Sequence, residues 1–298
     1  MRRKPLLLTL VTAVTLAVAS PASAGLFAPE RGGSPNADRI ADLYWIIFAI
    51  ALVVFAIVLG TLLYSLVKFR ERRGAVAAQI RGNTRLEIGW TVGAALILVA
   101  LAIVTFVELP GIRDPENSSA SGLKLANGTL LAGSPTKRLP PNGRSLNICV
   151  NGQQYVWRFT YSQDCTKNDF KAPFAYETMV VPTDTTVTLD ITGQDVIHSW
   201  WIPKLGGKFD AVPGYVNHTW FKVPGRLAGT TFGGQCAELC GRNHADMVAH
   251  VKAVSPSDFE AWLDQQKSDI EAADKAAQQQ RKQYEPQTAT TSDQSTTP

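Results

Sequence analysis

The sequence predicts a membrane-anchored all-β protein, in which a two-helix transmembrane hairpin precedes a β-sandwich or barrel. Two uncharged apolar runs, 43–67 and 89–107, are each long enough to cross a bilayer, which needs about 20 residues. From residue 146 onward, short alternating runs separated by Pro, Gly, Asp and Asn are typical of β-strands. Hydrophobic residues make up 45% of the chain and charged residues 18%, which favours a combination of membrane spans and a folded polar domain.

The first 24 residues have the pattern of a secretory signal peptide. Arg2, Arg3 and Lys4 precede an apolar run that ends at small residues near Ala24. A first membrane anchor is the alternative, but the run is short for a span. Loss of these three basic residues lowers the formal net charge from +4 to about +1, which gives nucleic acid no electrostatic support as a partner. Residues 25–42 then form an extracytoplasmic N-terminal segment.

Residues 43–108 form the predicted hairpin, with a cytoplasmic loop at 68–87. This loop carries six basic residues against two acidic ones, and the positive-inside rule therefore places it in the cytoplasm. Tyr44, Trp45 and Trp90 lie near the ends of the spans, as interfacial aromatic residues do. A buried hairpin of a soluble domain is the alternative, and two uncharged runs of this length argue against it. Both ends of the mature chain are then extracytoplasmic.

The rest of the chain divides by composition into a linker, a β domain and a tail. Residues 109–145 are rich in Gly, Pro, Ser and Asn without periodicity, as linkers are. Residues 146–265 contain the strand-like runs, and about a hundred residues can bury one core. A helix is predicted over 257–267, starting at a Ser/Asp cap. Residues 266–298 hold almost no large apolar side chains, which predicts a polar, disordered tail.

One short segment concentrates soft metal ligands. Cys236, Cys240, His244 and Met247 lie within twelve residues, and His198 lies about forty residues upstream. Sulfur ligands together with imidazole suit copper, whereas a thioether is a poor ligand for zinc, calcium or magnesium. A disulfide within the segment and a mononuclear copper site are the alternatives. The disulfide would need neither the histidine nor the methionine, and a second thiolate allows both sulfurs to bridge two metals.

The spacing of these residues resembles a known family pattern. Cys-x-Glu-x-Cys-x3-His-x2-Met, preceded by Asp-Val-x-His-Ser-Trp, resembles cytochrome c oxidase subunit II, and the similarity runs from about residue 43 to 262. The resemblance implies a cupredoxin-like Greek-key β-sandwich with a dinuclear copper centre, CuA, in which the two thiolates bridge the coppers. The implied copper ligands are His198, Cys236, Glu238 (through its backbone carbonyl), Cys240, His244 and the weakly bound Met247. The side chain of Glu238 would also help to hold Mg²⁺ at the interface with subunit I.

The same resemblance implies an enzyme subunit with several partners. The chain would accept electrons from reduced cytochrome c and relay them to the haem–copper O₂-reduction site of subunit I, coupled to proton translocation. Subunit III and the lipid bilayer would be further partners, in a bacterial-type plasma membrane. A quinol oxidase subunit II lacks the copper ligands, and a nitrous oxide reductase needs a large propeller domain. A copper-delivery module is disfavoured by the two spans.

Three side chains are candidates for electron input and proton uptake. The family segment Gly-His-Gln-Trp-x-Trp reads Gly152-Gln-Gln-Tyr-Val-Trp here, so Tyr155 replaces the electron-receiving Trp and Trp157 matches the inner one. Alternatively, both fill the core from one face of a strand. Glu87 matches a family glutamate that lies at the mouth of a proton channel into subunit I. Alternatively, it is an ordinary interfacial carboxylate that pairs with Arg85.

The charges in segment 164–171 alternate in sign. Asp164 and Asp169 alternate with Lys167 and Lys171, so acidic steering of a basic donor should be weak. The donor is therefore expected to be a dedicated, membrane-tethered or complex-bound cytochrome c that docks on an apolar patch around Tyr155.

Two further cysteines have no counterpart in the family pattern, and in an oxidising compartment a disulfide is favoured over two free buried thiols. These are Cys149 and Cys165.

Overall fold

The computed structural model describes residues 28–71, 76, 79–124, 139–165 and 171–288. The predicted signal peptide lies outside these residues. The chain divides into two compact units, of which the first comprises Met1–Gly32 and Ala37–Pro110, and the second Gly33–Asn36 and Gly111–Pro298.

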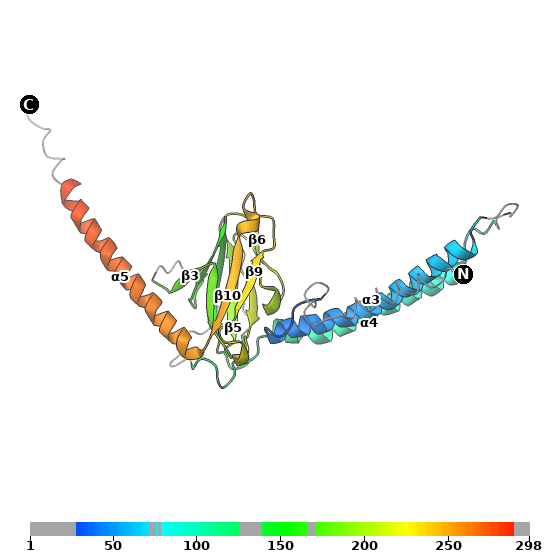
Figure 1. Cartoon of the computed structure of the whole chain (residues 1–298), viewed down its shortest axis with the longest axis horizontal. Coiled ribbons are helices and arrows are strands. Elements are labelled where there is room, and N and C mark those ends of the chain that lie inside the picture. The colour runs from blue at the N-terminus through cyan, green and yellow to red at the C-terminus, as the bar shows by residue number, and fades with distance from the viewer. Residues whose placement is uncertain (1–27, 72–75, 77–78, 125–138, 166–170, 289–298) are drawn as a thin grey trace, which may run out of the picture. The chain divides into compact units, whose positions relative to one another are not determined.

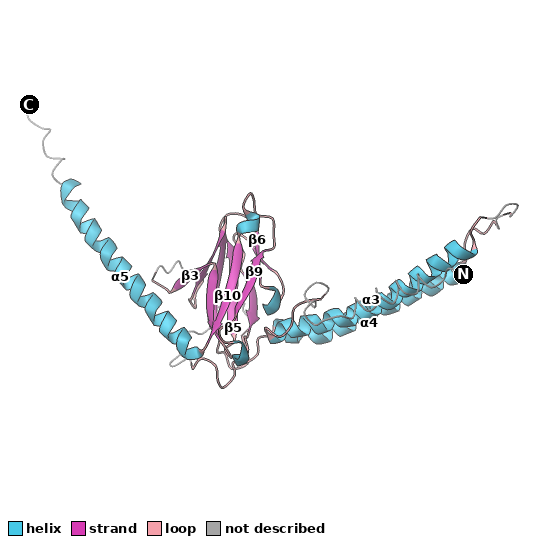
Figure 2. Cartoon of the chain, in the orientation of Figure 1, coloured by secondary structure: helices cyan, strands magenta, loops and turns pink. Residues whose placement is uncertain are grey.

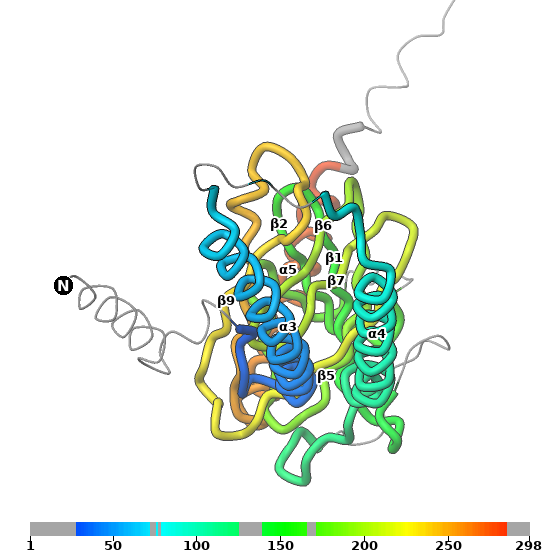
Figure 3. The backbone as a smooth tube through the Cα atoms, turned by 90° about the vertical axis from the view of Figure 1, so that its right-hand side faces the viewer, coloured from blue at the N-terminus to red at the C-terminus, as the bar shows by residue number. Residues whose placement is uncertain are grey.

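The first unit is a helical hairpin made of α3 (Pro35–Lys68) and α4 (Thr84–Arg113) (Figure 1). Both helices are long and apolar enough to cross a membrane, and their apolar stretches are not buried in the protein. The ion pair between Arg39 Nη1 and Glu108 Oε2, at 3.6 Å, joins the start of α3 to the end of α4. Figure 3 shows the two helices as separate coils. The predicted transmembrane hairpin is therefore confirmed.

Both helices extend beyond the apolar runs that predicted them. α3 begins eight residues before Leu43, and α4 ends six residues after Val107. The predicted bounds marked only the part that suits hydrocarbon, whereas the backbone hydrogen bonds of a helix continue through polar flanking residues. The segments predicted at 25–42 and 109–145 therefore each contain a helical end.

The second unit is a β-sandwich of two five-stranded sheets (Figure 2). Its strands are β1 Leu146–Gln153, β2 Val156–Thr160, β3 Phe174–Tyr176, β4 Thr178–Pro182, β5 Val187–Gly193, β6 His198–Trp201, β7 Phe209–Ala211, β8 Asn217–Phe221, β9 Thr231–Cys236 and β10 Val248–Val254. One sheet has the order β3-β2-β1-β5-β8 and the other β4-β10-β9-β6-β7. β1 pairs with β5 and β4 with β10 in parallel, and the remaining pairs are antiparallel.

The core lies between the two sheets and follows the two-residue period of the strands. In β1, Leu146, Ile148 and Val150 are fully buried, and Leu189 and Ile191 of β5 are buried beside them. Removing such side chains from water contributes about 25 cal/mol per Å² of apolar surface, the main force that holds the sheets together. The strand order and this shared core confirm the predicted cupredoxin-like β-sandwich.

The described part of the predicted linker is hydrogen-bonded to the β domain. Trp220 Nε1 donates to the carbonyl oxygen of Ile112 at 3.0 Å, and Thr186 Oγ1 donates to that of Glu116 at 2.6 Å. The backbone N–H of Ser119 donates to Asp184 O at 2.8 Å. Local sequence without periodicity therefore still becomes ordered where a sheet satisfies its backbone groups. Residues 125–138 lie outside the described part.

The C-terminal helix corrects the prediction of a disordered tail. α5 spans Pro256–Thr288, so residues 266–288 are polar, as expected, but helical. Its start is capped by Ser255, whose Oγ accepts a hydrogen bond from the backbone N–H of Asp258 at 3.1 Å. Phe259 anchors the first turn in the core. The later turns consist mainly of Ala, Gln, Lys and Glu, whose helix propensity is high, so a low apolar content did not prevent helix formation. Residues 289–298 are not described.

Candidate metal centre

Strand pairing brings the upstream histidine to the cysteine segment. His198 is the first residue of β6, and Cys236 is the last residue of β9. These two strands are antiparallel neighbours, with Trp200 opposite Cys236, and the backbone N–H of Ala237 donates to Ser199 O at 2.8 Å. The pairing of β6 with β9 thus brings His198 and Cys236, about forty residues apart in the sequence, next to each other.

The predicted sulfur and imidazole ligands lie together. The Sγ atoms of Cys236 and Cys240 are 3.9 Å apart. His198 Nδ1 lies 3.9 Å from Cys236 Sγ, and His244 Nδ1 lies 3.5 Å from Cys240 Sγ. Met247 Sδ is 3.9 Å from Cys240 Sγ. Each thiol therefore has an imidazole of its own, and the two thiols lie between the two rings.

The backbone carbonyl predicted as a ligand also faces this cluster. The carbonyl oxygen of Glu238 lies 3.2 Å from Cys236 Sγ, whereas the residue as a whole is exposed. The main-chain oxygen and the carboxylate of one residue are thus available to different partners.

Most of the cluster is buried and its thiols are free, whereas His244 is half-buried. His198 and Met247 are fully buried, and Cys236 and Cys240 are 2% and 4% exposed. Burial, followed by the neighbouring Cys236, raises the pKa of the Cys240 thiol to about 11. A metal must therefore displace thiol protons when it binds. Two thiols, two imidazoles, a thioether and a carbonyl oxygen fit copper and do not fit a hard cation.

Asp195, which was not among the predicted site residues, orients His198. Asp195 Oδ1 lies 2.8 Å from His198 Nε2, so the other ring nitrogen, Nδ1, faces Cys236. Metal-binding histidines are commonly fixed in this way through their second nitrogen. Burial acts to raise the pKa of Asp195, but three hydrogen bonds, the first from the backbone N–H of Gln154, outweigh it and lower the pKa. The available signal was an acidic residue three positions before a candidate ligand.

The two aromatic candidates occupy different surroundings. Trp157 in β2 is fully buried, and its ring meets that of His198 edge-on with centroids 5.9 Å apart. Tyr155 precedes β2, is half-buried, and its Oη accepts a hydrogen bond from the backbone N–H of Arg242 at 3.0 Å. Both side chains therefore lie next to predicted ligands, one in the core and one against the cysteine loop.

Glu87 lies in the helical unit, in the first turn of α4. Its Oε1 accepts a hydrogen bond from the backbone N–H of Asn83 at 3.2 Å, and Asn83 Oδ1 accepts one from Leu86 N at 3.2 Å. These reciprocal contacts cap the helix start. The carboxylate thus contacts Asn83 rather than the Arg85 that the alternative proposed.

The other two cysteines are joined. Cys149 of β1 and Cys165 form a disulfide with Cα atoms 5.5 Å apart. Two charges of the alternating set that predicted weak steering, Lys167 and Asp169, lie outside the described residues.

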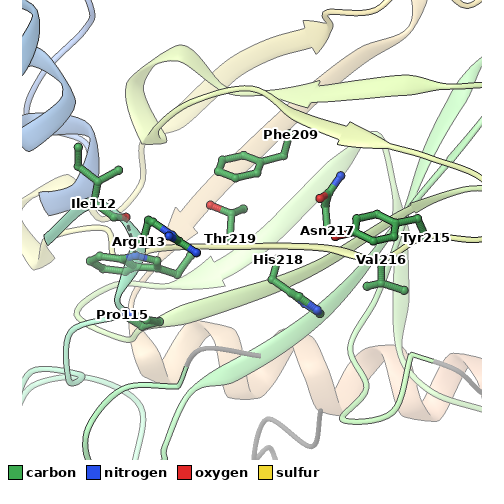
Figure 4. Close-up of a pocket in the computed structure, with 10 residues that line it drawn as sticks. Ile112, Arg113, Pro115, Phe209, Tyr215, Val216, Asn217, His218 and Thr219 are labelled. Atoms are coloured by element: carbon green, nitrogen blue, oxygen red, sulfur yellow. Dashed lines mark hydrogen bonds between the residues drawn. The ribbon is translucent and has the colours of Figure 1, made fainter. Parts of the chain in front are cut away.

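A separate pocket in the β domain contains none of the predicted ligands (Figure 4). Arg113, Phe209 and His218 are among its lining residues, and His218 Nδ1 lies 2.7 Å from the buried carboxylate of Asp190. His250 is half-buried within β10. Neither histidine belongs to the ligand cluster.

Two family models match the chain. One describes the transmembrane domain of cytochrome c oxidase subunit II and matches residues 21–107, and the other describes its periplasmic domain and matches residues 146–254. Cytochrome c oxidase subunit 2 of Cereibacter sphaeroides is 32% identical over 255 residues, which cover 80% of this chain and 81% of that protein. The probable cytochrome c oxidase subunit 2 of Rickettsia bellii is 32% identical over 77% of this chain and 80% of its own length.

Two further proteins are similar over different shares of their length. Cytochrome c oxidase subunit 2 of Alkalihalophilus pseudofirmus is 30% identical over 80% of this chain, which spans 61% of that protein. The crystal structure of the periplasmic domain of subunit II of cytochrome oxidase from Bradyrhizobium japonicum is 31% identical, covers 42% of this chain and 95% of that one, and has a TM-score of 0.37. The chain therefore belongs to the cytochrome c oxidase subunit II family, as a membrane-anchored subunit of a haem–copper oxidase.

Proposed function

We propose that this chain accepts electrons from reduced cytochrome c at a dinuclear copper centre and relays them to the O₂-reduction site of subunit I, in a complex that translocates protons. The observation that carries the proposal is the pair of free, buried thiols 3.9 Å apart, each with its own imidazole. Bound there, two sulfur-bridged coppers would share one electron with little change in geometry.

The chain's own contribution to such a centre is rigidity and exclusion of water. His198 is held by strand β6 and by Asp195, and Cys236 is held by the pairing of β9 with β6. Met247 and both thiols are shielded from solvent. A ligand set fixed by packing and hydrogen bonds in this way is preorganised for function.

Tyr155 and Trp157 support an electron-input route from the donor. Tyr155 offers a partly exposed ring with its hydroxyl on the cysteine loop, and the buried ring of Trp157 meets that of His198. An amphipathic aromatic ring suits a partner interface. The donor would be a dedicated, membrane-tethered or complex-bound cytochrome c, docked mainly through apolar contact.

The exposed carboxylate of Glu238 supports a second proposed site. Its backbone carbonyl faces Cys236 while its side chain remains accessible. Mg²⁺ prefers oxygen ligands and usually takes one or two carboxylates from a protein. In this proposal Glu238 contributes one of them at the interface with subunit I. Subunit III completes the proposed set of membrane partners.

The orientation of the copper domain follows from the charge of the hairpin loop. Six basic residues in 68–87 support a cytoplasmic position of that loop, and in this proposal the β domain is extracytoplasmic, in a bacterial-type plasma membrane. Glu87 lies at the cytoplasmic start of α4 in this arrangement, where it would act in proton uptake.

The proposal is tested by electron paramagnetic resonance of the purified native complex that contains the full chain. An unpaired electron shared between two coppers is expected, because the two thiols lie 3.9 Å apart and each has an imidazole of its own. A signal from a single copper would contradict the dinuclear assignment.

The role of Glu87 is tested by Glu87→Gln in the same complex. Glutamine retains an oxygen that accepts the Asn83 N–H, so the helix cap persists while the titratable group is lost. Steady-state turnover should fall with unchanged copper content, and turnover equal to that of the unmutated complex would leave the residue only its capping role.

A further inference from the structure

The turn that joins β1 and β2 lies against both parts of the ligand set. The turn itself is Gln154 and Tyr155, and it follows Gly152 near the end of β1, where an added Cβ would lie 3.1 Å from the ring of His198 and 3.0 Å from that of Trp157. Real Cβ atoms seldom approach other atoms that closely. The missing side chain therefore lets the two rings pack against the backbone of the turn.

Gln154 contacts each part of the ligand set with a different group. Its backbone N–H donates to Asp195 Oδ2 at 2.7 Å, and Asp195 in turn contacts His198 Nε2. Its side-chain Nε2 donates to the carbonyl oxygen of Cys240, also at 2.7 Å. One residue thus links the histidine that belongs to β6 with the cysteine that belongs to the loop after β9.

Tyr155 makes a second contact with the same loop. Its Oη accepts the backbone N–H of Arg242 at 3.0 Å, two residues after Cys240. Gly241 lies between Cys240 and Arg242 and has φ +131°. A Cβ added to Gly241 would lie 2.6 Å from Tyr155 Oη. Only glycine accommodates both this backbone conformation and the approach of the hydroxyl.

We propose that Gln154 and Tyr155 are positioning residues that fix Cys240 and, through Asp195, His198, so that the turn that receives the electron donor also sets the geometry of the copper centre. The identity of the metal in this inference rests on the proposed function. The two hydrogen bonds hold the loop on either side of Gly241, and the contact with Asp195 holds His198 on the other side of the cluster. Loss of either contact would let a ligand atom move, and hydrogen bonds of this kind, outside the ligands themselves, tune a metal site.

The contact with the Arg242 N–H depends on the phenol oxygen of Tyr155. A tryptophan at this position could not make it. The polar group of tryptophan is an N–H that only donates, so it cannot accept a hydrogen bond from the Arg242 N–H. The phenol oxygen accepts it here, and the same side chain serves both as a contact face and as an anchor of the cysteine loop.

The test compares three variants in the native complex with the full chain. Gln154→Ala removes the amide that contacts Cys240, Tyr155→Phe removes only the hydroxyl, and the adjacent Gln153→Ala is the matched control, because it makes neither contact. For each variant the measurements are the electron paramagnetic resonance spectrum, the rate of copper loss to a chelator, and the KM for the cytochrome c donor.

Gln154→Ala and Tyr155→Phe should each change the spectrum and lose copper about tenfold faster. Changes to residues that hold metal ligands in place commonly weaken metal binding by at least about this factor. Gln153→Ala should match the unmutated complex in its spectrum and in its rate of copper loss. If Gln154→Ala does not assemble, Gln154→Glu replaces the donating amide at the same length and should show the same effects.

An unaltered spectrum and copper retention in Tyr155→Phe together with either Gln154 variant would overturn the inference, whatever happens to the KM. This outcome differs from failure of the proposed function, which would appear in the unmutated complex as a single-copper signal.

Discussion

The two cysteine pairs of the β domain have the same chemistry available to them and differ in what surrounds them. Cys149 and Cys165 are sixteen residues apart, half-buried and joined by a disulfide. Cys236 and Cys240 are four residues apart, buried and free, with their sulfurs 3.9 Å from each other. The pair that is closer in sequence is thus the one that remains unbonded.

The difference shows that the scaffold, and not the spacing, decides the state of a cysteine pair. A disulfide needs its sulfurs about 2.05 Å apart. Cys236 is held at the end of β9 by pairing with β6, and the loop that carries Cys240 is hydrogen-bonded to Gln154 and Tyr155. These contacts hold the two sulfurs 3.9 Å apart, with two imidazoles and a thioether beside them.

The largest effect should come from replacing one thiol of the free pair. Cys236→Ser or Cys240→Ser should abolish the two-copper resonance, because a serine hydroxyl does not supply the soft bridging sulfur. Cys149→Ser in the same complex is the control and should retain the resonance. A two-copper signal in either variant of the free pair would remove the basis for distinguishing the pairs.

Loss of the disulfide should affect stability rather than copper. The double change Cys149→Ser and Cys165→Ser opens a loop whose closure contributes about 3 kcal/mol to the free energy of unfolding. Denaturant unfolding of the β domain within the full chain should shift by that amount, while the copper spectrum stays the same. A changed copper spectrum in this double variant would show that the disulfide and the free cysteine pair are not independent.

A smaller effect is expected at the glycine between the two loop contacts. Gly241→Ala forces a side chain into a left-handed conformation at φ +131°, which costs about 1–3 kcal/mol, and places it against Tyr155 Oη. Copper should be lost faster than from the unmutated protein. Adding Tyr155→Phe removes the hydroxyl but not the backbone strain, so the double variant should lose copper faster than Tyr155→Phe alone, and equal rates in these two variants would show that the strain is unimportant.

The smallest effect is expected at the thioether. Met247→Leu nearly conserves volume, and such exchanges in a core usually cost less than about 1.5 kcal/mol. Both coppers should remain, and the redox potential should shift because a weak ligand is gone. Loss of one copper would show that Met247 is as essential as the thiols.

Much of the architecture follows from short-range patterns in the sequence. Hydropathy alone located both transmembrane helices, because a span requires a continuous apolar run in one segment. The alternation of apolar and polar residues located the β domain, and residue types at fixed intervals identified His198, Cys236, Cys240, His244 and Met247 as candidate ligands. These features are local, since a ligand's softness and a strand's two-residue period do not depend on distant parts of the chain.

Other features appeared only when the chain was folded. Asp195 could be recognised as the partner of His198 only once the ring orientation was known, and Gln154 reaches Cys240 across a separation of 86 residues. Only the first part of α5, over 257–267, was predicted, because its continuation depends on backbone propensity rather than on an apolar face. Residue types alone thus determined which metal chemistry is available, whereas the tertiary structure decided how the ligands are held apart, because hydrogen bonds between distant segments exist only after the strands have paired.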